Sequence, residues 1–297
     1  GHWPWSRARL AELVEAARNA GAETVVLDMP LPEADTTSPR EALKVWSPLP
    51  PEANVTALAA ALAELPDHDI LLVEALQAGS SVVTLTPGKG VTQNAPSQVT
   101  DIADIGGNPL RYAPRYDNWV PTLGRLSRNA DGNGAGLPSQ RQSDRVRSIP
   151  MLTNLDGKLF PASTLEALRV HQAADGYQAR VTIPEGAFVI GEPAGLAEVT
   201  IIGTDNNIQT QADGSLRLYF RSMPQQATYE AWRIMSDAEA FDLNGKIAVT
   251  GFSGNGADRN YDTVGGPLPP GAIIAHGREP CPRSGHRERR GAGAGCW

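Results

Sequence analysis

The sequence has 297 residues, 41% of them hydrophobic and only 6% aromatic, so it can form one large domain or two small ones around a mainly aliphatic core. This composition excludes the fibrous and the fully disordered classes. The formal net charge of −7 argues against non-specific binding to nucleic acids or anionic membranes, because both interactions need basic patches.

Helices and short buried strands are predicted to alternate in the first third of the chain. Ser6 is placed to cap the first helix, and Gly21 stands where a helix commonly ends. The run SVVTLT is apolar throughout, which is typical of a parallel strand covered on both faces. In chain order we expect a helix over 7–20, a strand over 24–28, a proline-rich loop over 30–53, helices over 54–65 and 69–78, and a strand over 81–86.

The rest of the chain is predicted to contain more strands. Asp156-Gly157 and Asp213-Gly214 favour hairpin turns, and Ser163 with Glu166 forms a capping-box pattern that opens a helix to about residue 173. We further expect little regular structure over 87–120, a short helix at 122–130, a mobile turn-rich segment at 129–136, a β-rich stretch at 180–221, a helix at 236–242 and a strand at 246–252. Together these elements predict an α/β fold with a mainly parallel central sheet flanked by helices and an inserted β-rich portion.

The last 21 residues differ from the body in charge and pattern. They hold five Arg and two Glu, so residues 1–276 carry −10. Residues 277–297 are predicted to be an unstructured tail outside the domain, either a cloning scar or a read-through in the wrong frame; a basic functional tail is the alternative. Both cysteines, Cys281 and Cys296, lie in this tail, so the body has no disulfide framework and no thiolate metal site.

The start of the sequence and its hydropathy suggest a piece of a longer protein. The chain has no apolar run of about 18 residues, which predicts that it has no transmembrane helix of its own. It begins at Gly1 without a methionine or a signal peptide. We therefore expect a fragment cut from a longer protein.

Polar residues follow two of the predicted strands at their carboxyl ends. In open parallel sheets, ligands bind outside the carboxyl ends of the strands. If these strands are neighbours, one crevice would hold the candidate ligand-binding residues Asp28, Asp35, Ser253, Asn255 and Asp258. The alternative for Asp28 is a structural one, in which its carboxylate accepts hydrogen bonds from loop N–H groups.

Two weaker motifs follow the last predicted strand. GFSGN nearly matches the nucleophile elbow G-x-S-x-G, but Asn255 replaces the final glycine and no helix is predicted after it. Asp258, Asn260 and Asp262 have the first three ligand spacings of a calcium loop. Thr263 and Pro269 then replace the glycine and the glutamate that such a loop needs, so we assign no metal or other cofactor.

Four stretches, spread over most of residues 3–276, have the order and spacing of one known family. They are WPWSRARLAELVEAARNAGAETVVLDMPLPEAD, HDILLVEALQAGSSVVTL, DRVRSIPMLTNLDGKLFPASTLEALRV and LNGKIAVTGFSGNGADRNYDTVGGPLPPGAIIAH. These stretches resemble the CHASE-type extracellular sensor domain of the second class, although the loop SGNGADRNYD departs from the Thr–Ala–x–Gly–x–Asp pattern usual there.

The resemblance implies a non-catalytic, extracytoplasmic sensory domain over residues 1–276. Its parent would be anchored in the membrane, with a nucleotide cyclase or a kinase as output and a homodimer as the usual signalling unit. The signal would be an unknown small molecule or protein. Two alternatives stay open: a periplasmic or secreted serine hydrolase that uses Ser253, and a protein-interaction module that presents residues 30–53 and 87–120.

Overall fold

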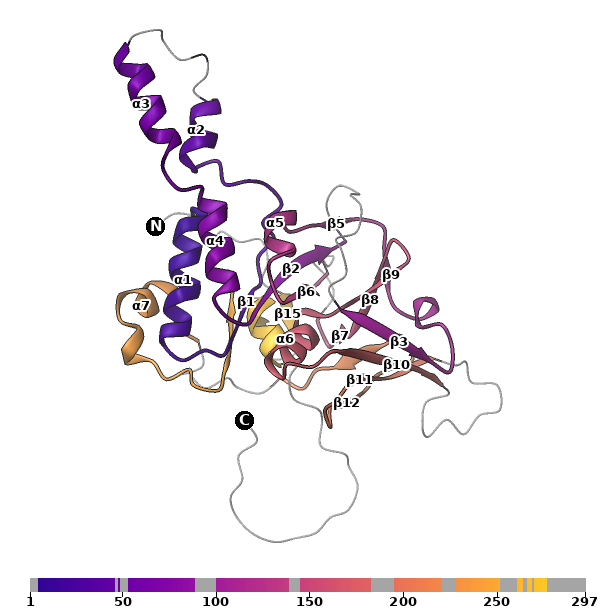
Figure 1. Ribbon diagram of the computed structural model, residues 1–297. Helices are drawn as coiled ribbons and strands as arrows, with labels where there is room; N and C mark the ends of the chain where they lie inside the picture. Colours follow the sequence, from indigo (N-terminus) through magenta and orange to yellow (C-terminus); the bar gives the residue numbers. More distant parts are fainter. Residues whose placement is uncertain are drawn as a thin grey trace.

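The chain folds as a mixed α/β protein with several sheets and helices, which confirms the predicted class (Figure 1). The computed structural model describes residues 5–45, 48, 53–88, 100–138, 145–182, 195–220, 228–251, 261–263, 266–268 and 270–276. The predicted tail at 277–297 lies outside these residues. Within them, no helix is both long and apolar enough to cross a bilayer.

The central sheet has five strands. Its order is β14-β1-β2-β5, and β6 also pairs with β2. β14, β1, β2 and β6 run parallel to their neighbours, whereas β5 pairs antiparallel with the end of β2. The strands are β1 (Thr24–Leu27), β2 (Ser81–Pro87), β5 (Trp119–Val120), β6 (Gly132–Ala135) and β14 (Ile247–Thr250).

Helices cover both faces of this sheet. The helices are α1 (Arg7–Asn19), α4 (His68–Gln77) and α6 (Ser163–His171). Side chains alternate along a strand, so Val25 and Leu27 pack into the cluster formed with α1 and α4. Val26 and Val82 point the other way and pack against Ala167 and Val170 of α6. Burial on both faces explains why β1 and β2 contain no charged residue.

The predicted ends of α1 are confirmed. The Ser6 side chain accepts a hydrogen bond from the Arg9 backbone N–H at 3.2 Å, and Gly21 has φ of +100° directly after the helix. Near the end of α1, Arg18 donates to the carbonyl oxygens of Ala75, Leu76 and Gly79. This side chain fastens α1 to the C-terminal end of α4.

A second, four-stranded sheet lies beside the central one (Figure 1). Its order is β12-β11-β10-β3, with β10 antiparallel to β11 and parallel to β3. The strands are β3 (Asp101–Ile105), β10 (Gly176–Thr182), β11 (Gly195–Ile201) and β12 (Asn207–Gln209).

Shorter elements complete the described chain. The predicted hairpin at Asp156-Gly157 is confirmed: it joins β8 to β9, with φ of 51° and 75° at the two turn residues. The remaining elements are α2 (Pro39–Val45), α3 (Ala53–Ala63), η1 (Pro109–Arg111), β4 (Arg115–Tyr116), α5 (Gly124–Ser127), β7 (Ser148–Pro150), β8 (Leu152–Leu155), β9 (Lys158–Pro161), β13 (Ser215–Arg217), α7 (Ala231–Ser236), η3 (Ala238–Ala240), β15 (Tyr261–Thr263), β16 (Gly266–Leu268) and α8 (Pro270–His276).

Several predicted elements were wrong. The segment 129–136, expected to be a mobile turn, contains the buried strand β6, and the poorly periodic 87–120 contains β3, β4 and β5. The proline-rich loop contains α2, and the helix expected at 122–130 is reduced to the four residues of α5. The helix expected at 236–242 is replaced by α7 and η3. The largest error concerns β6, which was missed because of its glycines.

Candidate functional site

Asp28 stands at the carboxyl end of β1, in the middle of the parallel part of the central sheet. Its backbone N–H donates to the Thr250 carbonyl oxygen at 2.8 Å, which ties the end of β1 to the end of β14. The residue is half-buried and has an interaction partner within the protein. The structure thus places Asp28 at the edge of the sheet where ligands of such folds are commonly bound.

Three glycines from separate elements surround the Asp28 carboxylate. A methyl group added at Gly136, just after β6, would lie 3.4 Å from Asp28 Oδ1. Methyl groups at Gly251, after β14, and at Gly271, in the first turn of α8, would lie 3.9 and 4.0 Å from Asp28 Oδ2. The absence of side chains at these positions lets the three elements lie close to the carboxylate, and its Oδ2 atom is buried.

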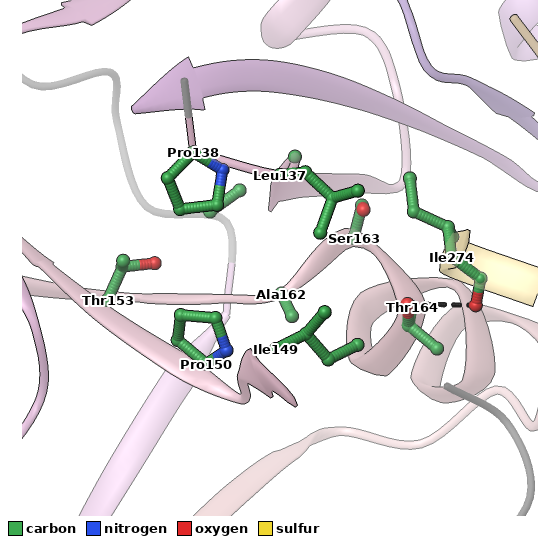
Figure 2. Close-up of a pocket in the computed structure, with 11 residues that line it drawn as sticks. Leu137, Pro138, Ile149, Pro150, Thr153, Ala162, Ser163, Thr164 and Ile274 are labelled. Carbon is green, nitrogen blue, oxygen red and sulfur yellow. Dashed lines mark hydrogen bonds between the residues drawn. The ribbon is translucent and has the colours of Figure 1, made fainter. Parts of the chain in front are cut away.

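Gly136 also lines a pocket, whose other lining residues are shown in Figure 2. Leu137 and Pro138 form one side of it, and Ile149 and Pro150 form another. At its base, Ser163 and Thr164 begin α6, where backbone N–H groups are left without helical partners. The enclosed space is enough for about one water molecule. In the conformation observed, a larger ligand would need the walls to move apart.

A hydrogen bond connects this pocket to the last described helix. The Thr164 hydroxyl, in the first turn of α6, donates to the Ile274 carbonyl oxygen of α8 at 3.1 Å (Figure 2). The Ile274 side chain also lines the pocket. α8 therefore begins beside Asp28 and also lines the pocket.

Asp35, expected to share the crevice with Asp28, is instead engaged at the start of α1. It is 5% exposed and accepts hydrogen bonds from the Arg7 backbone N–H at 2.6 Å and from both the N–H and the hydroxyl of Thr37. His68 Nδ1 lies 3.2 Å from Asp35 Oδ2. These contacts make Asp35 an anchor for the loop that follows β1.

Further polar contacts connect the loop around Asp35 to the start of α4. Ser38 Oγ accepts from the His68 N–H at 2.9 Å and donates to Asp67 at 3.3 Å. Asp67 also pairs with Arg125 at 3.0 Å. Asp69, 1% exposed, accepts from the Asp35 N–H at 3.3 Å and lies 3.7 Å from Arg7 Nε. We call this set of residues the clasp: Arg7, Asp35, Thr37, Ser38, Asp67, His68, Asp69 and Arg125.

The three carboxylates of the clasp differ in pKa. Burial would raise the pKa of Asp35, but hydrogen bonds from Arg7 and Thr37 outweigh it and lower that pKa. For Asp67, burial is likewise outweighed by the Asp69 N–H and by Arg125, so its pKa is lowered. Burial and then the charge of Asp67 raise the pKa of Asp69, against the opposing effect of the Asp35 N–H and the two arginines.

Glu166 forms a fully buried polar centre, a role that the sequence analysis did not predict. Its side chain is fully buried and accepts from Thr100 Oγ1 at 2.9 Å, from Arg169 Nη2 at 2.9 Å and from the Tyr177 hydroxyl. Burial and the Glu166 charge raise the pKa of Tyr177 well above its usual value. Burial alone would lower the pKa of Arg169, but the hydrogen bond to Glu166 outweighs the effect of burial and raises the pKa of Arg169.

The predicted capping box at α6 was wrong. Ala162 is the residue that precedes the helix, and no side chain caps it. Ser163 is already inside the first turn, and the Glu166 carboxylate is taken up by Arg169 and Tyr177 instead of by the backbone. Tertiary contacts from β10 therefore overrode the local pattern, and only the tyrosine eleven residues later could have signalled this.

The other candidate residues lie outside the described part of the chain. These are Ser253, Asn255 and Asp258, together with Asn260 of the calcium-like motif; for Asp262 only the backbone, in β15, is described. Among the described residues, no group of three or more His, Cys, Asp or Glu side chains is arranged to hold a metal ion.

Comparison with known proteins gives one clear result. A family model described as the CHASE2 domain matches residues 1–277. No curated protein and no solved structure matches the chain.

Proposed function

The chain belongs to the CHASE2 domain family, whose members are extracytoplasmic sensory domains of signalling receptors, and from this premise we propose that it is the ectodomain of a membrane-anchored receptor with a cyclase or kinase output. The observation that carries the proposal is the family match over residues 1–277. The domain works by binding a signal and shifting between conformations, without catalysis.

The edge of the central sheet around Asp28 is the proposed place of signal recognition. Asp28 lies among glycines of three elements and its Oδ2 atom is buried, so a ligand reaches this oxygen when those elements move apart. A carboxylate acceptor there favours a small polar signal that carries an amine or hydroxyl donor. Ser253, Asn255 and Asp258 follow the strand next to β1 and are proposed to contribute from the same edge.

Signal transmission is proposed to run through α8. The pocket beside Gly136 holds about one water molecule, so a bound signal has to separate its walls. Thr164 and Ile274 connect those walls to α8. Ligand binding therefore favours a second position of α8, and the differential affinity for the two positions sets how far the equilibrium moves.

A thermal-melt screen tests this function. The full chain is melted with amino acids, sugars, nucleotides, carboxylates and divalent cations, with chelator controls. A specific ligand at 100 times its Kd stabilises the protein by about 2.7 kcal/mol, which raises the melting temperature by a few degrees. The ligand should be recovered unchanged, and the chain should not hydrolyse generic esters.

Two results would contradict the proposal. Turnover of an ester that is lost in the Ser253→Ala variant would establish a hydrolase. A melt unaffected by the whole panel, together with a stable mixed complex on size-exclusion chromatography, would establish a module that binds another protein.

A further inference from the structure

Three side-chain hydroxyls line the pocket at the start of α6. Thr153 donates to a carbonyl oxygen of β9 at 3.3 Å, and Thr164 donates to one of α8 at 3.1 Å. The third hydroxyl, of Ser163, makes no hydrogen bond to any described residue, although Ser163 is only 1% exposed. Figure 2 shows its oxygen turned towards Leu137 on the pocket wall. Buried polar groups normally have a partner, so this hydroxyl is available to a ligand.

The backbone next to this hydroxyl adds further hydrogen-bond donors. Ser163, Thr164 and Leu165 are the first residues of α6, a helix of nine residues that no side chain caps. The N–H groups of a first turn have no acceptor within the helix, and they form the positive end of the helix dipole. Such an end favours an anionic group. The base of the pocket therefore combines an unengaged hydroxyl with a helix end that attracts anions.

The walls of the pocket indicate which anion fits. Among the described residues, no Lys, Arg or His side chain lines the pocket, and Leu137, Pro138, Ile149 and Pro150 make its walls apolar. A phosphate or sulfate dianion would enter without a counter-charge, which is unfavourable in apolar surroundings. The enclosed space, enough for about one water molecule, also favours a small group. A carboxylate meets both conditions when its ligand carries a compensating positive charge.

Asp28 lies close enough to bind that positive charge. Gly136 lines the pocket, and a methyl group added to it would lie 3.4 Å from Asp28 Oδ1. α8 also borders both places, through Gly271 beside Asp28 and Ile274 in the pocket. These two residues are three positions apart on one helical face, a rise of about 4.5 Å. The ammonium and carboxylate groups of one α-amino acid, each with a hydrogen bond of about 3 Å, span such a distance.

We propose that Ser163 and the N-terminus of α6 bind the carboxylate of a small α-amino acid, whose ammonium group binds Asp28. The inference rests on the signal recognition at Asp28 proposed above, and it narrows the signal from any amine or hydroxyl compound to a zwitterion. The ammonium group lies between the two carboxylates and offsets their repulsion. The side chain of the amino acid is small, because the pocket encloses little space.

Thermal melts of the full chain with matched probes test the proposal. The probes are glycine, L-alanine and L-serine at about 10 mM, each compared with its amide, which lacks the carboxylate, and its N-acetyl form, which lacks the ammonium group. At least one free amino acid should raise the melting temperature by a few degrees. Its amide and its N-acetyl form should bind at least about 10-fold more weakly, because each loses one charged hydrogen-bonding group.

Ser163→Ala locates the carboxylate. The variant removes a hydrogen bond to a charged group, so the affinity for the stabilising amino acid should fall about 10- to 100-fold. The weak affinity for its amide should not change. Ser81→Ala is the matched control, because the Ser81 hydroxyl is also buried without a hydrogen-bond partner among the described residues, but it lies at the start of β2, outside the pocket. This control should bind the amino acid like the unaltered chain.

The outcomes separate this inference from the sensory role on which it rests. Equal stabilisation by the amino acid and its amide overturns the carboxylate site but leaves recognition of an amine at Asp28 intact. Equal affinity of Ser163→Ala and the unaltered chain does the same. If none of the three amino acids shifts the melt, while another compound does so and loses its effect in Asp28→Asn, the inference fails and the sensory role stands. No shift with any compound contradicts both.

Discussion

Glu166 joins parts of the chain that are far apart in the sequence. Its carboxylate receives hydrogen bonds from Thr100 ahead of β3, from Arg169 on α6 and from Tyr177 on β10. The second sheet is thereby fixed to the helix that covers the first. A buried charge is stable only while its partners satisfy it, so this connection is sensitive to small chemical changes.

Replacing Glu166 by Gln should therefore destabilise the protein strongly. The variant keeps the shape but leaves Arg169, whose side chain is only 11% exposed, without its counter-charge. Loss of one partner of a buried ion pair costs about 3–5 kcal/mol. Denaturant unfolding measures this loss. Glu198→Gln removes a more exposed pair with Arg180 and should cost under about 1 kcal/mol; equal losses in the two variants would show that Glu166 is not a structural centre.

The stability of the protein at acidic pH should depend on the carboxylates of the clasp. The lowered pKa of Asp35 means that its contribution to stability is present above its ordinary value of 3.8 and is lost as pH falls through the lower folded-state pKa. Unfolding of the unaltered chain and of Asp35→Asn should be compared across this range. The unaltered chain should lose stability relative to the variant as the pH drops below about 4. Parallel pH profiles would contradict the contacts described for Asp35.

The contribution of Asp69 to stability should change with pH in the opposite direction to that of Asp35. Burial raises its pKa, so its protonated form is favoured in the folded protein, and the stability it contributes is lost as pH rises through that raised value. As pH falls from 7 towards 4, the unaltered chain should gain stability relative to Asp69→Asn. A difference between the two proteins that stays constant over this range would argue against a buried, desolvated Asp69.

At the scale of elements, β6 shows how helix packing can require glycine in a strand. A methyl group at Gly134 would lie 2.4 Å from Ser163 Cα, and one at Gly132 would lie 2.7 Å from Glu166 Cγ. α6 can approach the sheet this closely only because these side chains are absent. The same glycines mark the wall between the Asp28 edge and the start of α6.

Gly134→Ala should accordingly separate α6 from β6. The backbone of Ser163 cannot yield as a flexible side chain would, and overpacking of this kind typically costs about 1–3 kcal/mol or more. Thermal unfolding provides the measurement. Gly157→Ala is the control for backbone strain alone, since Gly157 has φ of +75° but no atom within 4 Å of an added methyl. A Gly134→Ala variant as stable as the unaltered chain would contradict the packing described here.

The elements that the sequence predicted well are those that carry their own signal. β1, β2 and β14 are apolar runs, and α1 has both an apolar face and a capping serine. β6 was missed because GNGA contains no side chain pattern; its strand character comes from its neighbours β2 and α6. α2 and α3 pack mainly on each other; α2 was missed, and the ends of α3 were predicted from weak propensities alone.

The candidate site was only partly predictable for a similar reason. The rule that ligands bind at the carboxyl ends of parallel strands led to Asp28, which does lie at such an end, beside β14. The rule does not say which way a following loop turns. Asp35 turns to the start of α1, where Arg7, Thr37 and His68 hold it, and no sequence pattern links residues so far apart.

At the scale of the whole molecule, the features described here have separate roles. The central sheet presents Asp28 at an edge where β1, β14, β6 and α8 meet, and the second sheet is held to it through Glu166. The clasp joins the two ends of the segment that forms α2 and α3, because the N–H of His68, at the start of α4, donates to Ser38, the residue before α2. The proposed site of signal recognition and the contacts that stabilise the fold thus lie in different parts of one chain.

The most direct test of the sensory role compares the melting of the unaltered chain and of Asp28→Asn, each with the strongest ligand of the screen at 100 times its Kd for the unaltered chain. Without ligand, the two proteins should melt within a few degrees of each other. With ligand, we predict a stabilisation of about 2.7 kcal/mol in the unaltered chain and little or none in the variant. Equal stabilisation of both proteins would remove Asp28 from the site, and no stabilisation by any ligand would contradict small-molecule sensing by this domain.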